Sequence, residues 1–212
     1  STTEGAGTDI AWIHRNIFGA DEDLSVTLKA AEIEQSFRTE LAAPNWKRLD
    51  QRIHVAGEIA REVTDTYEEQ KISAESGVSR PFGKRWKGSA TGVLEVLETT
   101  ENAVTTQNVV AAFPLIALYD GSNDPFDPSK GYKLEFKLEP AAITLDNTDF
   151  LATFSMGGSV YHDLLGDKTL IAAARSRAAF ILGPARDRIP ASRRLYAGGG
   201  GSIRGFEFQS VG

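Results

Sequence analysis

The feature that most constrains the fold of this chain is a strict alternation of apolar and charged residues near its middle. Tyr132, Leu134, Phe136 and Leu138 alternate with Lys133, Glu135, Lys137 and Glu139. Side chains of a β-strand point in turn to its two faces, whereas a helix would scatter these residues around its axis. The segment is therefore predicted to be a strand with one apolar and one charged face.

The same period of two recurs along most of the chain, in windows around residues 24–30, 53–60, 71–78, 87–96, 150–160 and 168–182. Segments rich in turn-forming residues separate the windows, most densely at 120–131. About ten strands at a spacing of roughly 15–20 residues predict an all-β antiparallel meander. Parity predicts that the apolar and charged residues of the later strands lie on opposite faces. The apolar residues predicted on one face are Leu134, Phe136, Leu138, Phe154 and Phe180. The charged residues predicted on the other face are Lys133, Glu135, Lys137, Arg175 and Arg177.

Three windows are less clear. Windows 33–41 and 55–63 carry apolar residues four positions apart, which also fits a helix. We predict strands there because the neighbouring Thr-containing sequence favours extended or turn structure. Val109–Tyr119 is apolar on both faces and contains Pro114, so its assignment rests on its neighbours.

Composition excludes several classes of protein. The 212 residues include no cysteine, which excludes a disulfide framework and thiolate metal sites, and the net charge of −6 argues against nucleic-acid binding. The longest apolar run is shorter than the about 20 residues of a membrane-spanning helix, but a barrel strand needs only about 9–11. The composition therefore does not exclude a transmembrane β-barrel. The chain begins without an initiator Met or a signal peptide, and we expect mature or trimmed material.

The last thirty residues differ from the rest. Gly183–Gly212 carries five arginines against two acids, with four consecutive glycines at 198–201. A linker would not continue into the apolar and aromatic residues that follow, and a phosphate-binding loop would need a Lys after the glycines. We predict a long functional loop whose glycines let the backbone pass close to another element.

Two motifs in the chain have a recognisable form. The first lies within Ile189–Phe206 and comprises Gly198, Gly199, Gly200, Gly201, Ser202, Ile203, Arg204, Gly205 and Phe206. The second lies within Tyr119–Tyr132 and comprises Asp124, Pro125, Asp127, Pro128, Gly131 and Tyr132. They resemble the sixth-loop signature and the Asp-Pro turn of the BamA/TamA superfamily of outer-membrane barrels, also called bacterial surface antigens. A weaker match is Arg15–Gly19, and the resemblance is closest to the TamA branch.

The resemblance implies a partial transmembrane β-barrel over residues 1–212, with 183–209 as the sixth loop. It implies that the periplasmic POTRA domains, most of the first strand and the last few strands are missing, so that the chain cannot close a family barrel alone. The implied function is insertion or translocation of proteins at the bacterial outer membrane, without enzymatic chemistry or a cofactor. The implied partners are outer-membrane lipid, substrate outer-membrane or secreted proteins, and a periplasmic partner protein of the full-length form. Nucleic acid is not among them.

The resemblance also gives Arg204 a role, because the family's loop folds back into the lumen and its arginine pairs with acids of the inner wall. Six acids of this chain share the lumenal parity: Glu58, Glu62, Glu75, Glu95, Glu135 and Glu139. An Arg-rich loop is suited to such an interior, because buried Arg–carboxylate contacts are stronger than exposed ones. A solvated loop arginine and solvated acidic strand faces are the plain alternatives.

No catalytic or metal site is indicated by the sequence. His14, His54 and His162 lack metal-ligand spacing, and Asp124 and Asp127 fit a turn better than a calcium loop. No Gly-x-Ser-x-Gly elbow is present. A passive porin-like channel and, less favoured, a barrel hydrolase remain alternative functions. A sheet with two unpaired edges is further expected to self-associate edge to edge.

Overall fold

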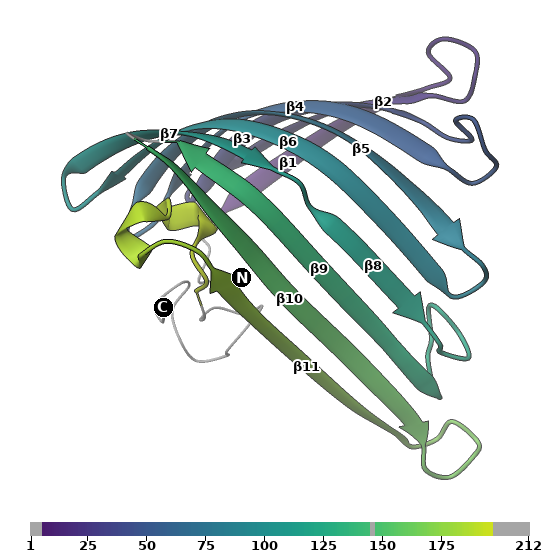
Figure 1. Cartoon of the computed structure of the whole chain (residues 1–212). Helices are drawn as coiled ribbons and strands as arrows, with labels where there is room; N and C mark the ends of the chain where they lie inside the picture. The colour runs from purple at the N-terminus through teal and green to yellow at the C-terminus, as the bar shows by residue number, and fades with distance from the viewer. Residues whose placement is uncertain (1–5, 145–146, 197–212) are drawn as a thin grey trace.

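The computed structural model describes residues 6–144 and 147–196, in which eleven strands form one antiparallel sheet (Figure 1). The strands are β1 (Gly7–Arg15), β2 (Asp23–Ala31), β3 (Glu34–Ala43), β4 (Arg52–Val63), β5 (Glu68–Phe82), β6 (Trp86–Glu101), β7 (Val104–Ala112), β8 (Leu115–Asp120), β9 (Gly131–Thr144), β10 (Thr148–Asp163) and β11 (Ile171–Leu182). Two 3₁₀ helices follow, η1 (Arg186–Arg188) and η2 (Ala191–Arg193). The predicted all-β antiparallel meander is confirmed.

The two windows that also fitted a helix are strands β3 and β4, as predicted. Residues four apart share a face of a strand as well as of a helix, so the spacing alone could not decide. In the sheet Phe37 lies directly opposite Ile59, and Ile59 lies directly opposite Ile72. The apolar side chains of neighbouring strands therefore pack side by side on the same face of the sheet.

Strands β7 and β8 lie in line and act as one strand interrupted at Pro114. Both pair with β6 on one side and β9 on the other. Proline has no N–H to donate, which breaks the ladder at this point, although the Pro114 carbonyl still accepts the Thr91 N–H at 3.0 Å. The segment is apolar on both faces because Val110 and Ala112 belong to a buried cluster on the concave side of the sheet.

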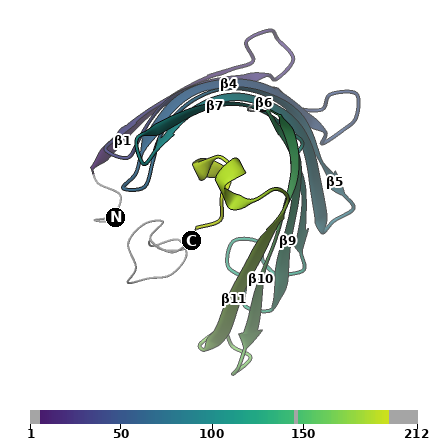
Figure 2. The same cartoon turned by 60° about the vertical axis from the view of Figure 1, so that its left-hand side comes forward.

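The sheet curls into an open trough, with η1 and η2 on its concave side (Figure 2). Neighbouring strands are joined at one end by residues 16–22, 44–51, 83–85, 121–130 and 164–170, and we call this the long-turn end because all but one of these turns have seven or more residues. At the other, short-turn end lie the turns 32–33, 64–67 and 102–103. Within the described residues β1 and β11 are the two edges, and each pairs with a single strand.

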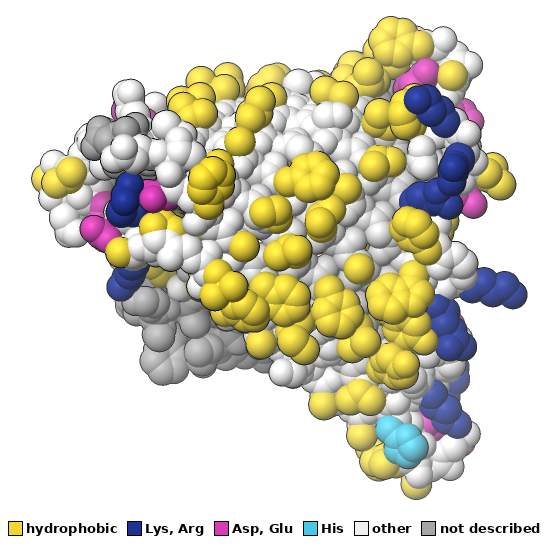
Figure 3. All heavy atoms as spheres, viewed as in Figure 1, with side chains coloured by type: hydrophobic (Ala, Val, Ile, Leu, Met, Phe, Trp, Pro, Cys, Tyr) yellow, Lys and Arg dark blue, Asp and Glu magenta, His cyan; other side chains and the backbone are white. Residues whose placement is uncertain are grey.

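The register confirms the predicted division of side chains between the faces. Phe154 lies opposite both Leu138 and Phe180, and Gly157 lies opposite both Glu135 and Arg177. Directly opposite residues of an antiparallel pair share a face, so the aromatic and aliphatic residues occupy one side and the charged residues the other. Hydrophobic side chains cover the middle of the convex face in Figure 3.

The apolar part of the convex face has the height expected for a membrane barrel. At the short-turn end one row of polar residues crosses five strands: Gln35, Arg61, Gln70, Glu98 and Gln107. On the same face of β5, the first charged residue after Gln70 is Arg80, ten residues further along the strand. At ~3.3 Å per residue and a strand tilt of ~40°, the intervening band is about 25 Å tall. No helix among the described residues is long and apolar enough to cross a membrane.

Candidate functional site

The segment after β11, residues 183–196, turns onto the concave face of the sheet, and we call it the anchor segment (Figure 2). It begins at Gly183, where a Cβ atom would lie 2.7 Å from the Cβ of Leu151, so only glycine lets the chain pass this close. Ile189 and Ala191 are buried, with exposed fractions of 6% and 1%. The segment is therefore packed against the wall.

Arg193 binds two carboxylates of the wall. Its Nη1 donates to Oε1 of Glu139 at 2.6 Å, and its Nη2 donates to Oε2 of Glu95. All three side chains are about one-seventh exposed, with values of 14%, 13% and 14% for Arg193, Glu139 and Glu95. Burial alone would lower the pKa of Arg193, but the carboxylates of Glu95 and Glu139 more than offset this and raise it above its ordinary value. Arg193 therefore stays charged and joins β6 to β9.

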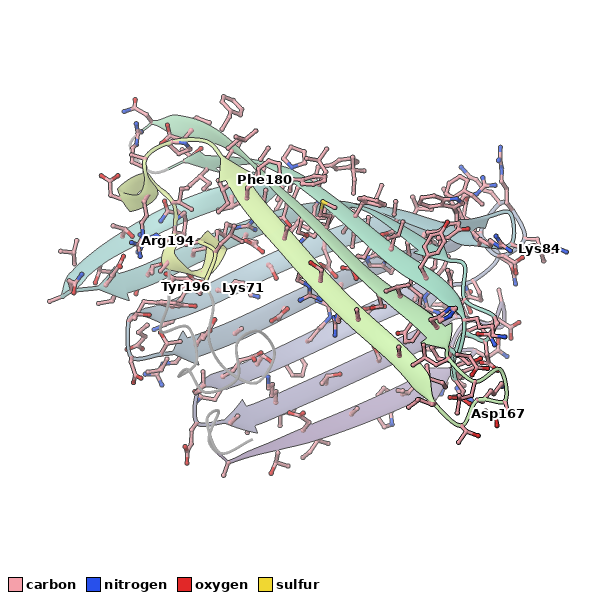
Figure 4. All side chains as sticks on the ribbon, turned by 90° about the horizontal axis from the view of Figure 1, so that it is seen from below. Lys71, Lys84, Asp167, Phe180, Arg194 and Tyr196 are labelled. Carbon is pink, nitrogen blue, oxygen red and sulfur yellow. The ribbon has the colours of Figure 1, made fainter. Side chains whose placement is uncertain are left out.

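The two neighbours of Arg193 bind the wall as well. Nη1 of Arg194 donates to both carboxylate oxygens of Glu101, at 2.9 and 3.0 Å, while its Nε donates to the Ile189 carbonyl at 2.9 Å. The Ser192 hydroxyl donates to Oε2 of Glu69 at 2.7 Å. Figure 4 shows Arg194 on the concave side, well away from Lys84 at the long-turn end.

The Glu69 carboxylate is bound from within the wall as well as by the anchor segment. Its Oε2 also accepts the Thr99 hydroxyl at 2.9 Å, and both residues are buried, at 4% and 3% exposed. A buried carboxylate is costly unless it is hydrogen-bonded. Ser192 and Thr99 together meet this need, so the wall presents a fixed acceptor to the segment.

Other acids of the inner wall bind cations of the wall itself. Glu58 accepts from Arg38 at 3.4 Å and from Lys71 at 3.2 Å, and Arg38 also pairs with Glu75. Between this part of the wall and the anchor segment lies a hollow of about 500 Å³, which Glu62 lines. The arrangement fixes a chain segment by charge and hydrogen bonds. Among the described residues no cluster of three or more His, Cys, Asp or Glu side chains could hold a metal ion.

The structure places the predicted site residues in two groups. The loop motif Gly198–Phe206, with Arg204, lies outside the described residues. The six acids of lumenal parity lie on the concave face, and Glu95 and Glu139 receive an arginine from the C-terminal segment, as the charge argument predicts. Sequence reasoning did not single out Arg193 and Arg194. They lie ten and eleven residues after Gly183, and this spacing does not say which arginine of the segment reaches the wall.

The predicted turn motif forms the connection between β8 and β9. Oδ1 of Asp124 accepts the N–H groups of Phe126 at 2.8 Å and Asp127 at 3.1 Å. These bonds lower the pKa of Asp124 below its ordinary value. Asp124 therefore shapes the turn through its own carboxylate, in the manner of an Asx-turn.

The other end of the turn depends on Gly131. Its φ of +100° is a conformation that side chains rarely adopt, and a Cβ would lie 2.3 Å from the Gly121 carbonyl oxygen. The Tyr132 ring then stacks on Tyr119 with 5.2 Å between centroids. The remaining motif residues, Pro125, Asp127 and Pro128, lie in the loop between these two ends, where the Pro125 carbonyl accepts Nζ of Lys133 at 2.7 Å.

Comparison with known proteins decides the family. The family model described as the Omp85 superfamily domain matches residues 16–212. The chain belongs to the Omp85 superfamily. The match covers the whole sheet from the β1–β2 turn onward and includes the anchor segment, so the site described above is part of the Omp85 domain.

A solved structure agrees with this assignment. The Omp85 chain is similar to the crystal structure of BamA from Haemophilus ducreyi lacking POTRA domains 1–3, with a TM-score of 0.85 and 13% sequence identity. The match covers 99% of this chain and 44% of the solved chain, so the Omp85 chain spans less than half the length of that relative. At this identity the likeness concerns the fold. No curated protein sequence matches the chain.

Proposed function

We propose that this chain forms part of the wall of a bacterial outer-membrane barrel that inserts or translocates proteins, and that it works in the manner of the TamA branch. The observation that carries the proposal is the anchor segment, fixed to the inner wall of an Omp85 sheet by Ser192, Arg193 and Arg194. The apolar band of about 25 Å on the convex face supports a location in the membrane.

In this proposal the anchor segment sets the position of the loop that follows it. Four carboxylates on β5, β6 and β9 hold residues 192–194 on the inner wall. The segment that precedes the loop motif is therefore fixed on that wall. Substrate chains add to the barrel by strand pairing at an edge, where backbone N–H and C=O groups are free to bond. No enzymatic step or cofactor is needed, and the partners are membrane lipid, substrate proteins and a periplasmic partner of the full-length protein.

The proposal is tested with the full-length protein in liposomes and an unfolded outer-membrane protein as substrate. Folded substrate is measured by its resistance to protease. We expect Arg193→Ala to reduce the insertion rate at least fivefold and Arg188→Ala to leave it within twofold, because Arg188 pairs with Asp149 at the surface. Ion conductance without any insertion by the native protein would contradict the proposal and favour a passive channel.

A further inference from the structure

A groove of about 410 Å³ lies on the convex face of the sheet near the long-turn end. Its floor consists of small residues on neighbouring strands, Gly88 and Ala90 of β6 and Ala117 of β8, with Gly88 directly opposite Ala117. The larger side chains of Phe82 and Phe136 line its sides. The Phe82 ring lies over Gly88, where a Cβ would come within 2.9 Å of it. The sheet thus has an apolar slot on the side that faces lipid.

A positively charged side chain, that of Arg80, lies at one end of this groove. Arg80 lines the groove, and its guanidinium lies over the Phe82 ring, 4.8 Å from the centroid. Arg80 is on the convex face directly opposite Gly88, and no carboxylate pairs with it among the described residues. A long cationic side chain on a lipid-facing surface extends its charge toward the headgroup level, while its carbon stem covers apolar surface.

The hairpin that carries Arg80 is basic throughout. From Ser76 to Leu94 it contains Arg80, Lys84, Arg85 and Lys87 and no acid. Lys and Arg side chains line the edge of the convex face at this end of the molecule (Figure 3), and Lys84 lies at the tip of the hairpin (Figure 4). Such a concentration of positive charge at the end of an apolar band attracts anionic headgroups.

Aromatic residues mark the same level of the sheet as an interface. The Trp86 and Tyr119 rings are 5.0 Å apart, and Tyr119 stacks on Tyr132 at 5.2 Å. Nη1 of Arg85 donates to the Tyr119 hydroxyl at 3.2 Å, which holds a second guanidinium beside the aromatic cluster. Tyr and Trp gather where the hydrocarbon of a membrane meets its headgroups. The apolar groove therefore extends from the level of the membrane hydrocarbon to the level of the headgroups, where Arg80 and Arg85 lie.

We propose that this groove is a binding site for a phosphate-bearing membrane lipid. One acyl chain lies over Ala90 and Ala117 beside the Phe82 ring, and the phosphate is bound by Arg80 with help from the basic tip of the β5–β6 hairpin. The inference rests on the proposed membrane location and not on the insertion activity. The groove and the charge are separate observations, and a lipid with an apolar chain and a phosphate satisfies both.

The test uses the full-length protein folded in nonionic detergent, with phosphatidylglycerol added to the micelles and bound lipid counted by native mass spectrometry. We expect one retained lipid, with Arg80→Gln lowering its occupancy at least fivefold. Arg61→Gln is the matched control, because Arg61 is also on the convex face, carries the same charge and pairs with Glu68 at the opposite end of the sheet. Ala117→Leu should fill the groove and lower occupancy similarly, whereas Ala111→Leu, outside the groove on β7, should not.

Several outcomes would overturn the site. Equal losses for Arg80→Gln and Arg61→Gln would show a general effect of charge, and an unchanged Ala117→Leu would remove the acyl chain from the groove. Inorganic phosphate is a further arm: displacement of the lipid by millimolar phosphate would show a site for free anions. Each variant is checked for its native β-sheet spectrum. Because binding is read in detergent, a failed insertion assay would leave this result standing, and a failed lipid assay would leave the proposed function standing.

Discussion

At the scale of single residues, Arg193 is expected to contribute most to holding the anchor segment. Arg193→Ala would leave Glu95 without its arginine and Glu139 with Lys137 alone, at a cost of about 3 kcal/mol. Lysine should restore part of this, because it keeps the charge but loses the planar fork that reaches both carboxylates. The free energy of unfolding in urea, measured for the protein in lipid or detergent, checks the ranking.

Arg188→Ala is the control for this prediction. Arg188 is nearly half exposed and pairs with Asp149 at 2.7 Å, so its loss should cost no more than about 1 kcal/mol. The resemblance leads us to expect that Arg204→Ala also exceeds Arg188→Ala in its effect on assembly. If Arg193→Ala and Arg188→Ala proved equally mild, the anchoring role of Arg193 would be wrong.

The sequence could predict the acids of this site but not their partners. Period-two parity says which face a strand residue occupies, and it assigned Glu95 and Glu139 to the inner wall. A loop has no such period. Whether Arg188, Arg193 or Arg204 meets those acids depends on where the chain turns after β11, which is set by the close approach of Gly183 to Leu151 and by the burial of Ile189.

The carboxylate of Asp124 provides a test by pH. Its pKa is lowered by hydrogen bonds from the Phe126 and Asp127 N–H groups, which favour the charged form. The stabilisation of the turn is therefore fully present above the ordinary Asp value of about 3.9 and is lost as the pH falls through the lower folded value. NMR titration of the side-chain carboxyl carbons should show Asp124 protonating at lower pH than an Asp in the unfolded chain. Protonation at or above that value would contradict the assignment.

At the scale of elements, two glycines with positive φ provide a matched pair. Gly131→Ala should destabilise the β8–β9 turn severely, because its Cβ would lie 2.3 Å from the Gly121 oxygen. Gly166→Ala in the β10–β11 turn has φ of +84° but no atom within 4 Å, so it should cost only about 1 kcal/mol. Heat-induced unfolding of the two variants, followed by gel mobility, compares them. Equal stability would mean that the turn motif tolerates a side chain at Gly131.

The strands were predictable to the extent that one face is apolar and the other polar. This held for β9, where Phe136 and Glu135 fall on opposite sides. It failed for the segment from β7 to β8, because Val110 is buried in a cluster with Leu97, Ile143 and Leu151, and both faces are then apolar. These residues come from three other strands, so no local sequence pattern predicts the cluster.

At the scale of the whole molecule, the edges of β1 and β11, each paired with a single strand among the described residues, predict self-association. Unpaired N–H and C=O groups form a template for another strand. We expect the 212-residue chain to form dimers in detergent, measured by sedimentation velocity. Successive N–H groups of β11 point alternately toward β10 and toward the free edge, so one of Ala173→Pro and Ala174→Pro should weaken the dimer while keeping the β10–β11 ladder. A monomer at all concentrations would contradict the expectation.

The position of the anchor segment inside the trough is the observation on which the proposed function depends, and the chain's lack of cysteine makes it directly measurable. Cysteines at 192 and 69 replace side chains that are hydrogen-bonded at 2.7 Å across the concave face, whereas Gln70 is the next residue of β5 and points to the convex face. In membranes containing the full-length protein, a short bis-maleimide should cross-link the Ser192→Cys, Glu69→Cys pair efficiently and leave the Ser192→Cys, Gln70→Cys pair unlinked. Equal yields for the two pairs, or no cross-link in either, would show that residues 183–196 are not fixed on the inner wall.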